Sequence, residues 1–263
     1  MKQRVLTAVV ALVVVLPPIV WGGAMGLSLL GAAAAAVAGR EFSSFIDRER
    51  PRPHWFGDIV VGQALYWTII LSPDRLLPMM GAAVVGLLVL HLFTFQSIER
   101  AGVGLMGSCA SILYTVCLLS FIPLIRGLPH GLSWIYFIML ITWAGDTGAY
   151  VAGRTFGRHR LYPQVSPGKT VEGAVGGVVF AIGAAFGAKL TFFPSLTVAE
   201  CLILAPLLDV AGVAGDLAES LMKRAAGVKD SGGLFPGHGG ILDRIDSLLF
   251  SSPLLYAYLD LVK

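Results

Sequence analysis

The polar residues of this 263-residue sequence are densest between positions 220 and 246. Four basic side chains in this stretch could neutralise phosphate, namely Lys223, Arg224, Lys229 and Arg244. Asp243 and Asp246 are three residues apart, so on a helix they project to the same side and could bind a hard cation through oxygen. Cations, carboxylates and a flexible loop together indicate a metal-assisted nucleotide site. The alternative is a surface loop whose charges are unrelated.

Within this stretch, residues 232–240 contain five glycines, at positions 232, 233, 237, 239 and 240. Glycine allows positive φ and a close approach of the backbone to a ligand, and successive backbone N–H groups can form an anion-binding nest. We therefore expect Gly239 and Gly240 to contact substrate. His238 lies inside this glycine-rich run, and we assign it a role beside the substrate.

Further acids lie upstream inside apolar segments, where ionisable side chains are costly and therefore point to function. One such segment contains Asp209, Asp216 and Glu219, and Asp146 lies late in another. Asp216, Ser220 and Lys223 follow one another at spacings of four and three residues, so they share one helix face. An aspartate–lysine pair across one helical turn is the alternative explanation, and it accounts for only one pair among these acids.

A second polar loop precedes the apolar segment that begins near residue 171. Lys169 and Thr170 follow a glycine and resemble the end of a Walker A loop, but Pro163 stands where that motif needs its first glycine. No strand is expected before the loop either, so we reject a P-loop. We expect Lys169 to contact phosphate, with Thr170 and Glu172 near the helix start. The alternative is helix capping by Thr170 or Ser166, with Glu172 in the first turn.

These residues belong to a chain that is 56% hydrophobic and only 13% charged, with a mean hydropathy of +0.79. A soluble domain usually carries about 25% charged residues, so this apolar excess cannot all pack inside one soluble core. The sequence predicts an all-α fold, a polytopic transmembrane helix bundle of about nine spans. The apolar segments lie at 4–21, 23–39, 57–71, 77–95, 103–125, 131–153, 171–192, 197–222 and 243–261.

Two of these segments need comment. The first resembles a secretory signal peptide, but it is too long for one. Pro17 and Pro18, followed by Trp21, Gly22 and Gly23, predict a break between the first two helices. The segment at 57–71 is near the lower limit for a full span.

The basic residues indicate how the helices are oriented. With a cytoplasmic N-terminus and nine crossings, only Arg75, Arg126, Lys189 and Lys263 fall outside, and the other 15 of the 19 Lys and Arg residues fall inside (19 − 4 = 15). This strong positive-inside bias predicts a cytoplasmic N-terminus, an outside C-terminus, and cytoplasmic loops at 40–56, 154–170 and 223–242. The first loop is basic, and we expect it to anchor anionic lipid headgroups.

The chemistry-bearing residues resemble one known family. The runs Ser220-x-Met-Lys-Arg224, Lys229-Asp-x-Gly232 and Phe235-Pro-x-His-Gly-Gly-Ile-x-Asp-Arg-Ile-Asp246 are similar to the signature of phosphatidate cytidylyltransferases, also called CDP-diacylglycerol synthases. The blocks Asp146-Thr-x-Ala-Tyr150 and Ser166-Pro-x-Lys-Thr-x-Glu-Gly173 also resemble blocks of that family. The resemblance covers the C-terminal half, and residues 1–130 match only as generic spans.

The resemblance implies an all-helical enzyme of the cell inner (cytoplasmic) membrane, often a homodimer, with its active site facing the cytoplasm and no nucleic-acid partner. The implied substrates are CTP and phosphatidic acid, and the implied metal is Mg²⁺, which K⁺ joins in some members. Residues 1–130 would form N-terminal transmembrane helices, and residues 131–263 the catalytic region with the signature loop at 220–246.

Matching positions give three sets of site residues. The metal set is Asp216, Asp243 and Asp246. The catalytic set is Asp216, Lys223, Arg224, Lys229, Asp230, His238 and Arg244. The substrate-binding set is Asp146, Tyr150, Ser166, Lys169, Thr170, Glu172, Ser220, Gly239 and Gly240.

Two other classes of protein remain as alternatives. A CTP-dependent polyprenol kinase or a CDP-archaeol synthase would act on another lipid with overlapping acids. A secondary transporter would also place acids within the membrane, but transporters tend to show pseudo-symmetric halves with paired broken helices. Here the polar residues concentrate in the C-terminal half near one surface, which argues against transport.

The charge bias generates a prediction about topology. A reporter fused after Lys263 should behave as exported, whereas the same reporter inserted at 160–165 should behave as cytoplasmic, because the basic loops stay inside. Paired fusions of alkaline phosphatase and a fluorescent protein at each position measure this. Finding both positions on one side of the membrane would rule out the nine-span arrangement.

Overall fold

The computed structural model describes residues 13–46, 52–95, 97–234 and 239–263, and these residues are almost entirely helical. The helical stretch at 13–20 is interrupted at Trp21 and Gly22, and a new helix begins at Gly23, which confirms the predicted break. The helices before residue 130 are α2 (Gly23–Ile46), α3 (Arg52–Leu71), η1 (Pro73–Arg75), α4 (Leu76–Thr94), α5 (Ile98–Ser111), the π-helical η2 (Ile112–Cys117) and α6 (Leu118–Gly127).

The remaining elements form the second half of the chain. They are α7 (Gly131–Phe156), β1 (Arg160–Tyr162), β2 (Ser166–Thr170), α8 (Val171–Leu190), α9 (Val198–Ala225) and α10 (Leu242–Val262). The chain packs as two compact units. The first contains Met1–Leu124 and Ala225–Arg244, and the second contains Ile125–Arg224 and Ile245–Lys263.

The described residues contain seven helices long and apolar enough to cross a membrane, so the prediction of an all-α polytopic membrane protein is confirmed. The helix at Trp55–Leu71 is apolar but shorter, and the first predicted segment begins outside the described residues. The candidate spans are Gly23–Phe45, Pro73–Thr94, Ile98–Gly127, Gly131–Phe156, Val171–Leu190, Val198–Ala225 and Leu242–Val262.

Helix surfaces carry apolar side chains where a soluble protein would carry polar ones. Val175 and Val179 on α8 are exposed, and so are Leu202 and Ile203 on α9. Exposed apolar surface of this extent marks contact with a membrane or a partner. Since these helices satisfy their own backbone hydrogen bonds, they can present such a surface to lipid.

Two polar loops differ from the prediction. The loop expected at 40–56 is much shorter, because α2 continues to Ile46 and α3 begins at Arg52. Phe42 is buried and stacks on Tyr114, with the ring centroids 5.2 Å apart. The last turns of α2 therefore pack against another helix, although the sequence around them is charged. Most of the basic run at 48–52 lies outside the described residues.

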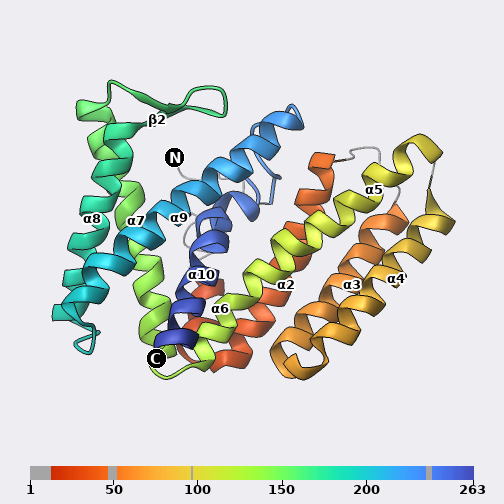
Figure 1. Ribbon diagram of the computed structural model, residues 1–263, viewed down its shortest axis with the longest axis horizontal. Coiled ribbons are helices and arrows are strands. Elements are labelled where there is room, and N and C mark those ends of the chain that lie inside the picture. Colours follow the sequence, from red (N-terminus) through yellow and green to blue (C-terminus); the bar gives the residue numbers. More distant parts are fainter. Residues whose placement is uncertain (1–12, 47–51, 96, 235–238) are drawn as a thin grey trace. The chain divides into compact units, whose positions relative to one another are not determined.

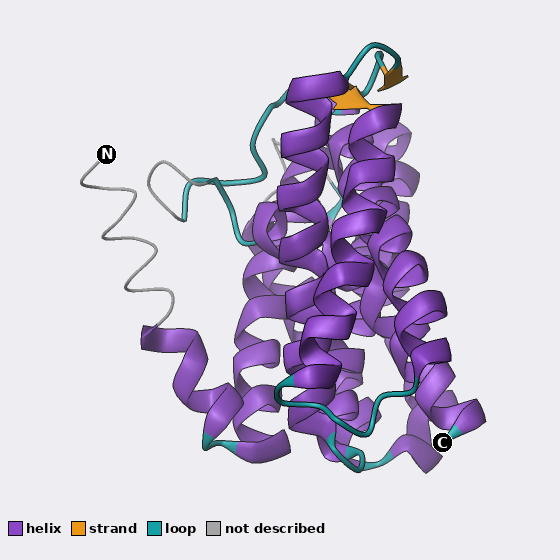
Figure 2. Cartoon of the chain, turned by 90° about the vertical axis from the view of Figure 1, so that its left-hand side faces the viewer, coloured by secondary structure: helices purple, strands orange, loops and turns teal. Residues whose placement is uncertain are grey.

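The loop expected at 154–170 contains a β-hairpin. Its strands β1 and β2 pair antiparallel, with Arg160 opposite Thr170 and Tyr162 opposite Ser166, and Pro163 lies in the turn between them. The expectation that no strand precedes Lys169 was therefore wrong. Strands this short, with an irregular register, leave no alternating pattern in the sequence. Figure 2 shows the hairpin at one end of the helices.

The first unit is held by small and polar contacts between helices. Tyr66 of α3 is fully buried, and its hydroxyl donates to the backbone oxygen of Ser28 in α2 at 3.0 Å. The Tyr66 ring lies against Gly31, where any larger residue would overlap it. Ser111 donates to the backbone oxygen of Gly39 at 3.0 Å, which joins α5 to α2.

In the second unit, α7 and α8 lie side by side over most of their length (Figure 1). Glycines permit this approach: a Cβ atom at Gly148 would lie 2.6 Å from the backbone oxygen of Gly176 and from Phe180. Small residues at helix contacts are a common way to bring membrane helices together. Near the start of α7, Trp134 makes an edge-to-face contact with Phe193, which follows α8, with the ring centroids 4.7 Å apart.

Candidate active site

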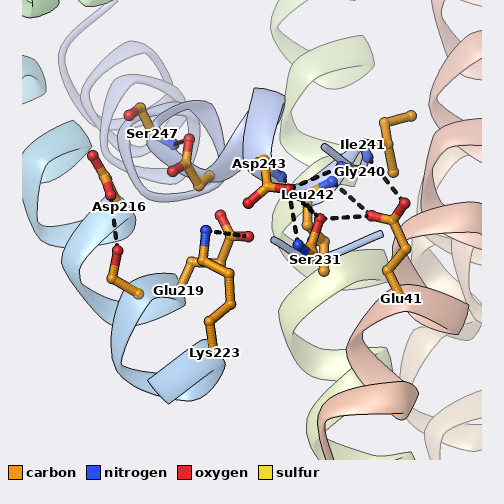
Figure 3. Close-up of polar contacts among 12 residues, drawn as sticks. Glu41, Asp216, Glu219, Lys223, Ser231, Gly240, Ile241, Leu242, Asp243 and Ser247 are labelled. Carbon is orange, nitrogen blue, oxygen red and sulfur yellow. Dashed lines mark hydrogen bonds and ion pairs between the residues drawn. The ribbon is translucent and has the colours of Figure 1, made fainter. Parts of the chain in front are cut away.

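The C-terminal turns of α9 carry the predicted polar face. Ser220 donates from Oγ to Oδ1 of Asp216 at 3.2 Å, so these two side chains meet as their spacing predicted. Lys223 has a different partner: its Nζ lies 3.2 Å from Oε1 of Glu219, one turn earlier (Figure 3). The Glu219 side chain is fully buried and that of Lys223 is nearly so. The acid one turn before Lys223 is thus a glutamate, and the aspartate of the expected aspartate–lysine pair, Asp216, contacts Lys169 of β2 instead.

The β-hairpin brings a second lysine to α9. Lys169 of β2 lies with its Nζ 2.6 Å from Oδ2 of Asp216, and both side chains remain partly exposed. Lys169 was predicted as a phosphate contact and Asp216 as a metal ligand, and the two residues form an ion pair. Charge-assisted contacts of this length are among the stronger polar interactions in proteins. The pair brings together a lysine, which can bind phosphate, and an aspartate, which can bind a metal ion.

Other predicted residues stabilise the same hairpin. Arg224 donates from Nε to the backbone oxygen of Val165 at 3.4 Å, and so connects the end of α9 to the turn before β2. Thr170 accepts from the backbone N–H of Gly173 at 3.0 Å and is the N-cap of α8, as the capping alternative predicted. Ser166 begins β2 and is not the cap.

Glu172, in the first turn of α8, accepts from three groups before β1. These are the backbone N–H of Arg158 at 3.1 Å, the backbone N–H of His159, and the ring Nδ1 of His159 at 2.6 Å. The end of α7, β1 and the start of α8 are thereby tied together around one carboxylate. Glu172 thus has an evident positioning role for the hairpin that carries Lys169.

Two predicted substrate residues lie one turn apart on α7. Asp146 and Tyr150 both have exposed side chains. The Tyr150 hydroxyl accepts from Nη1 of Arg154 at 2.8 Å. The three residues follow one another at four-residue spacings, so they form a polar stripe along one face of α7.

Helix α10 approaches α9 next to Asp216. A Cβ atom on Gly215 would lie 2.5 Å from the backbone oxygen of Asp246, so only glycine allows this contact. The carboxylates of Asp216 and Asp246 are close enough for their charges to repel each other. Like charges that are held together in an apolar surrounding favour a cation between them. In the structure, Lys169 supplies a positive charge beside Asp216.

The signature loop in the first unit has its own set of contacts. Asp243 accepts at Oδ2 from the backbone N–H of Ser231 at 2.9 Å, from the Ser231 hydroxyl at 2.8 Å and from the backbone N–H of Gly240 at 2.9 Å. Gly239 has φ +83°, as expected of a glycine in a tight loop. Lys229, Asp230 and Arg244 are exposed, and His238 lies outside the described residues.

The donor set fits a hard cation by its chemistry, because Mg²⁺ prefers carboxylate oxygens. Within the residues that the structure describes, however, no three His, Cys, Asp or Glu side chains are grouped so as to hold a metal ion. A carboxylate has about four acceptor positions. The loop contacts of Asp243 are therefore compatible with metal binding.

Sequence reasoning missed Glu41. This residue of α2 accepts hydrogen bonds from the signature loop, although it lies in the half of the chain that resembled only generic spans. Its one local signal was its type, an acid at the end of a long apolar segment. Sequence reasoning counted Glu219 among the acids that point to function but did not foresee that it is the fully buried partner of Lys223.

Comparison with known proteins gives a consistent result. The model of the cytidylyltransferase family matches residues 2–262. A protein of Staphylococcus saprophyticus named phosphatidate cytidylyltransferase is 33% identical, and the alignment covers 97% of each chain. Proteins of the same name from Bacillus subtilis and Haemophilus influenzae are 41% and 44% identical over 66% and 47% of this chain, and over 62% and 44% of their own.

The Lys223–Glu219 pair generates a prediction about stability. Lys223→Met should lower the free energy of unfolding by about 3–5 kcal/mol, because it removes one partner of a buried ion pair. Adding Glu219→Gln should recover most of that loss, since it removes the remaining charge. Denaturation in detergent micelles measures both effects. Lys229→Met is the matched control, because Lys229 is exposed. Equal stability of Lys223→Met and the control would show that the pair does not stabilise the helix.

Proposed function

Because the chain belongs to the cytidylyltransferase family, we propose that it transfers CMP from CTP to phosphatidic acid, giving CDP-diacylglycerol and pyrophosphate in phospholipid biosynthesis. The observation that carries the proposal is the full-length similarity to relatives named phosphatidate cytidylyltransferase. The names of these relatives also favour phosphatidic acid over an isoprenoid lipid as the acceptor.

The chemistry makes definite demands on the protein. An oxygen of the phosphatidate phosphate forms a bond to the α-phosphorus of CTP, and the bond from that phosphorus to the bridging oxygen of the β-phosphate breaks. The nucleophile is already anionic near neutral pH, so no general base is required. The protein has to reduce the repulsion between two anions and stabilise the leaving pyrophosphate.

The second unit offers groups for this task. Lys169 and Asp216 lie together at the end of the hairpin, and Asp246 interacts electrostatically with Asp216. We infer that Lys169 contacts a phosphate group once a metal ion takes its place beside Asp216. In the first unit, exposed Lys229 and Arg244 are further candidates for phosphate contacts.

We propose that Mg²⁺ is the metal, bound by Asp216, Asp246 and Asp243. When bound, Mg²⁺ would neutralise phosphate charge and polarise the reacting phosphate as a Lewis acid. The support is the chemistry of the donor set together with the proximity of two like charges on α9 and α10. Asp216 would then exchange its contact with Lys169 for the metal.

The membrane supplies the second substrate. The apolar helices suit a multi-pass protein whose lipid substrate keeps its acyl chains in the bilayer. We propose a location in the bacterial inner membrane, with the site facing the cytoplasm where CTP is found, and a homodimeric assembly. The distribution of basic residues supports this orientation.

The proposed reaction can be distinguished from its closest alternative by the position of a label. Purified protein in mixed micelles should transfer radioactivity from α-labelled CTP, but not from γ-labelled CTP, to phosphatidic acid. Omitting Mg²⁺ should abolish the transfer, and adding K⁺ tests for a second ion. Labelled lipid from γ-labelled CTP with a polyprenol acceptor would instead identify a kinase and overturn the proposal.

The metal proposal predicts the effect of three substitutions. Asp216→Asn, Asp243→Asn and Asp246→Asn should each lower Mg²⁺-dependent turnover by about a hundredfold or more, because each removes a charge that stabilises the transition state. Titrating Mg²⁺ in the labelling assay measures the change, and normal purification checks the fold.

Asp209→Asn is the matched control for these variants. Asp209 lies on the same helix, seven residues before Asp216, and is buried against Gly145 and Gly177 of α7 and α8. We expect a milder loss, because this carboxylate lies two turns deeper in the helix bundle. Near-normal turnover in all three proposed ligand variants would show that the metal is held elsewhere.

A further inference from the structure

Glu41 receives three hydrogen bonds from the signature loop (Figure 3). Its Oε1 accepts from the backbone N–H of Ile241 at 3.1 Å, and its Oε2 accepts from the backbone N–H of Leu242 at 3.0 Å and from the Ser231 hydroxyl at 3.1 Å. Glu41 is buried, with 9% of its surface exposed. All the residues in this group belong to the first compact unit.

These contacts meet a specific need of α10. The first N–H groups of a helix have no acceptor inside the helix, and a negative charge there is favourable. Here Glu41 accepts from Ile241 and Leu242, Asp243 accepts from Gly240, and the Ser231 hydroxyl accepts from Asp243 at 3.4 Å. A residue of α2 therefore caps the helix that carries two of the three proposed metal ligands, Asp243 and Asp246.

The position of Glu41 also accounts for two signature glycines. A Cβ atom on Gly232 would overlap Oε1 of Glu41, and its three nearest neighbours would all be atoms of that side chain. A Cβ atom on Gly240 would overlap both Oε2 of Glu41 and the Ser231 hydroxyl. A side chain at either position would thus displace the carboxylate of Glu41 from its hydrogen bonds. By contrast, a Cβ atom on Gly233 would meet nothing within 4 Å.

We propose that Glu41 is a positioning residue of the reaction: it holds Ser231 and residues 240–243 in the conformation that presents Asp243 and the start of α10. The effect on catalysis rests on the proposed function, whereas the effect on the loop does not. Misplacing reacting groups by as little as 1 Å can lower a rate about a hundredfold. The N-terminal helices thereby contribute directly to the proposed active site.

The first test compares two conservative changes at one position. Glu41→Gln keeps the size but turns one acceptor into a donor, and Glu41→Asp keeps the carboxylate but is one methylene shorter. We expect Glu41→Gln to lower kcat about ten- to hundredfold, as the loss of charge-assisted hydrogen bonds implies, and Glu41→Asp to retain more activity. A role in packing alone would give the opposite order, so higher activity of Glu41→Gln than of Glu41→Asp would overturn the proposal.

The second test follows the loop without using the reaction. Trypsin cleavage after the exposed Lys229 should be faster in Glu41→Gln and in Gly232→Ala than in the unsubstituted protein. In the Glu41→Ala background, Gly232→Ala should cause no further increase, since the overlapping side chain has been removed. Gly233→Ala and Glu99→Gln, which is exposed on α5, are controls expected to cleave at the original rate.

The outcomes separate this inference from the proposed function. If Glu41→Gln did not change the cleavage rate, Glu41 would not hold the loop. The same conclusion would follow if Gly232→Ala still accelerated cleavage in the Glu41→Ala background. Faster cleavage with unchanged CTP transfer would overturn its link to the reaction. If the unsubstituted protein transferred no CMP, the proposed function would fail, and the cleavage rates would still decide whether Glu41 holds the loop.

Discussion

A charged side chain inside a bundle of apolar helices has little water to solvate it, so its partners have to come from the protein. This constraint accounts for the partners of the buried acids near the proposed active site. Glu219 is fully buried and pairs with Lys223, and Asp216 pairs with Lys169 from the hairpin. Glu41 meets the same requirement with backbone N–H groups in place of a cation.

The small hairpin matters because it carries Lys169, the partner of Asp216. Lys169 can reach Asp216 only because β1 and β2 carry it back to the end of α9. The hairpin is in turn stabilised by Glu172 and Thr170 at the start of α8, and by Arg224 at the end of α9. Two of the residues predicted to contact substrate, Thr170 and Glu172, thus also stabilise the hairpin that carries Lys169.

Much of the fold followed from the sequence, because long apolar runs have one stable form in a membrane. The helical spans, the break before Gly23 and the contact between Asp216 and Ser220 were all predicted by composition or local spacing. What escaped prediction depends on distant residues. The hairpin is too short to show alternation, and the pairing of Lys169 with Asp216 joins residues 47 positions apart (216 − 169 = 47). The hydrogen-bond partners of Glu41 lie 190 or more positions away in the sequence, so no local pattern predicts them.

The membership of residues 225–244 in the first compact unit has a consequence for biosynthesis. Helix α2 is synthesised early, whereas Leu242, which donates a hydrogen bond to Glu41 of α2, is synthesised 201 residues later. The pair of α7 and α8 is contiguous and can assemble as soon as both helices have been inserted. The first unit, in contrast, stays incomplete until almost the whole chain has been translated. A nascent chain interrupted before residue 231 would keep the Glu41 carboxylate without its loop, and we expect membrane quality-control proteases to recognise such fragments as unfinished.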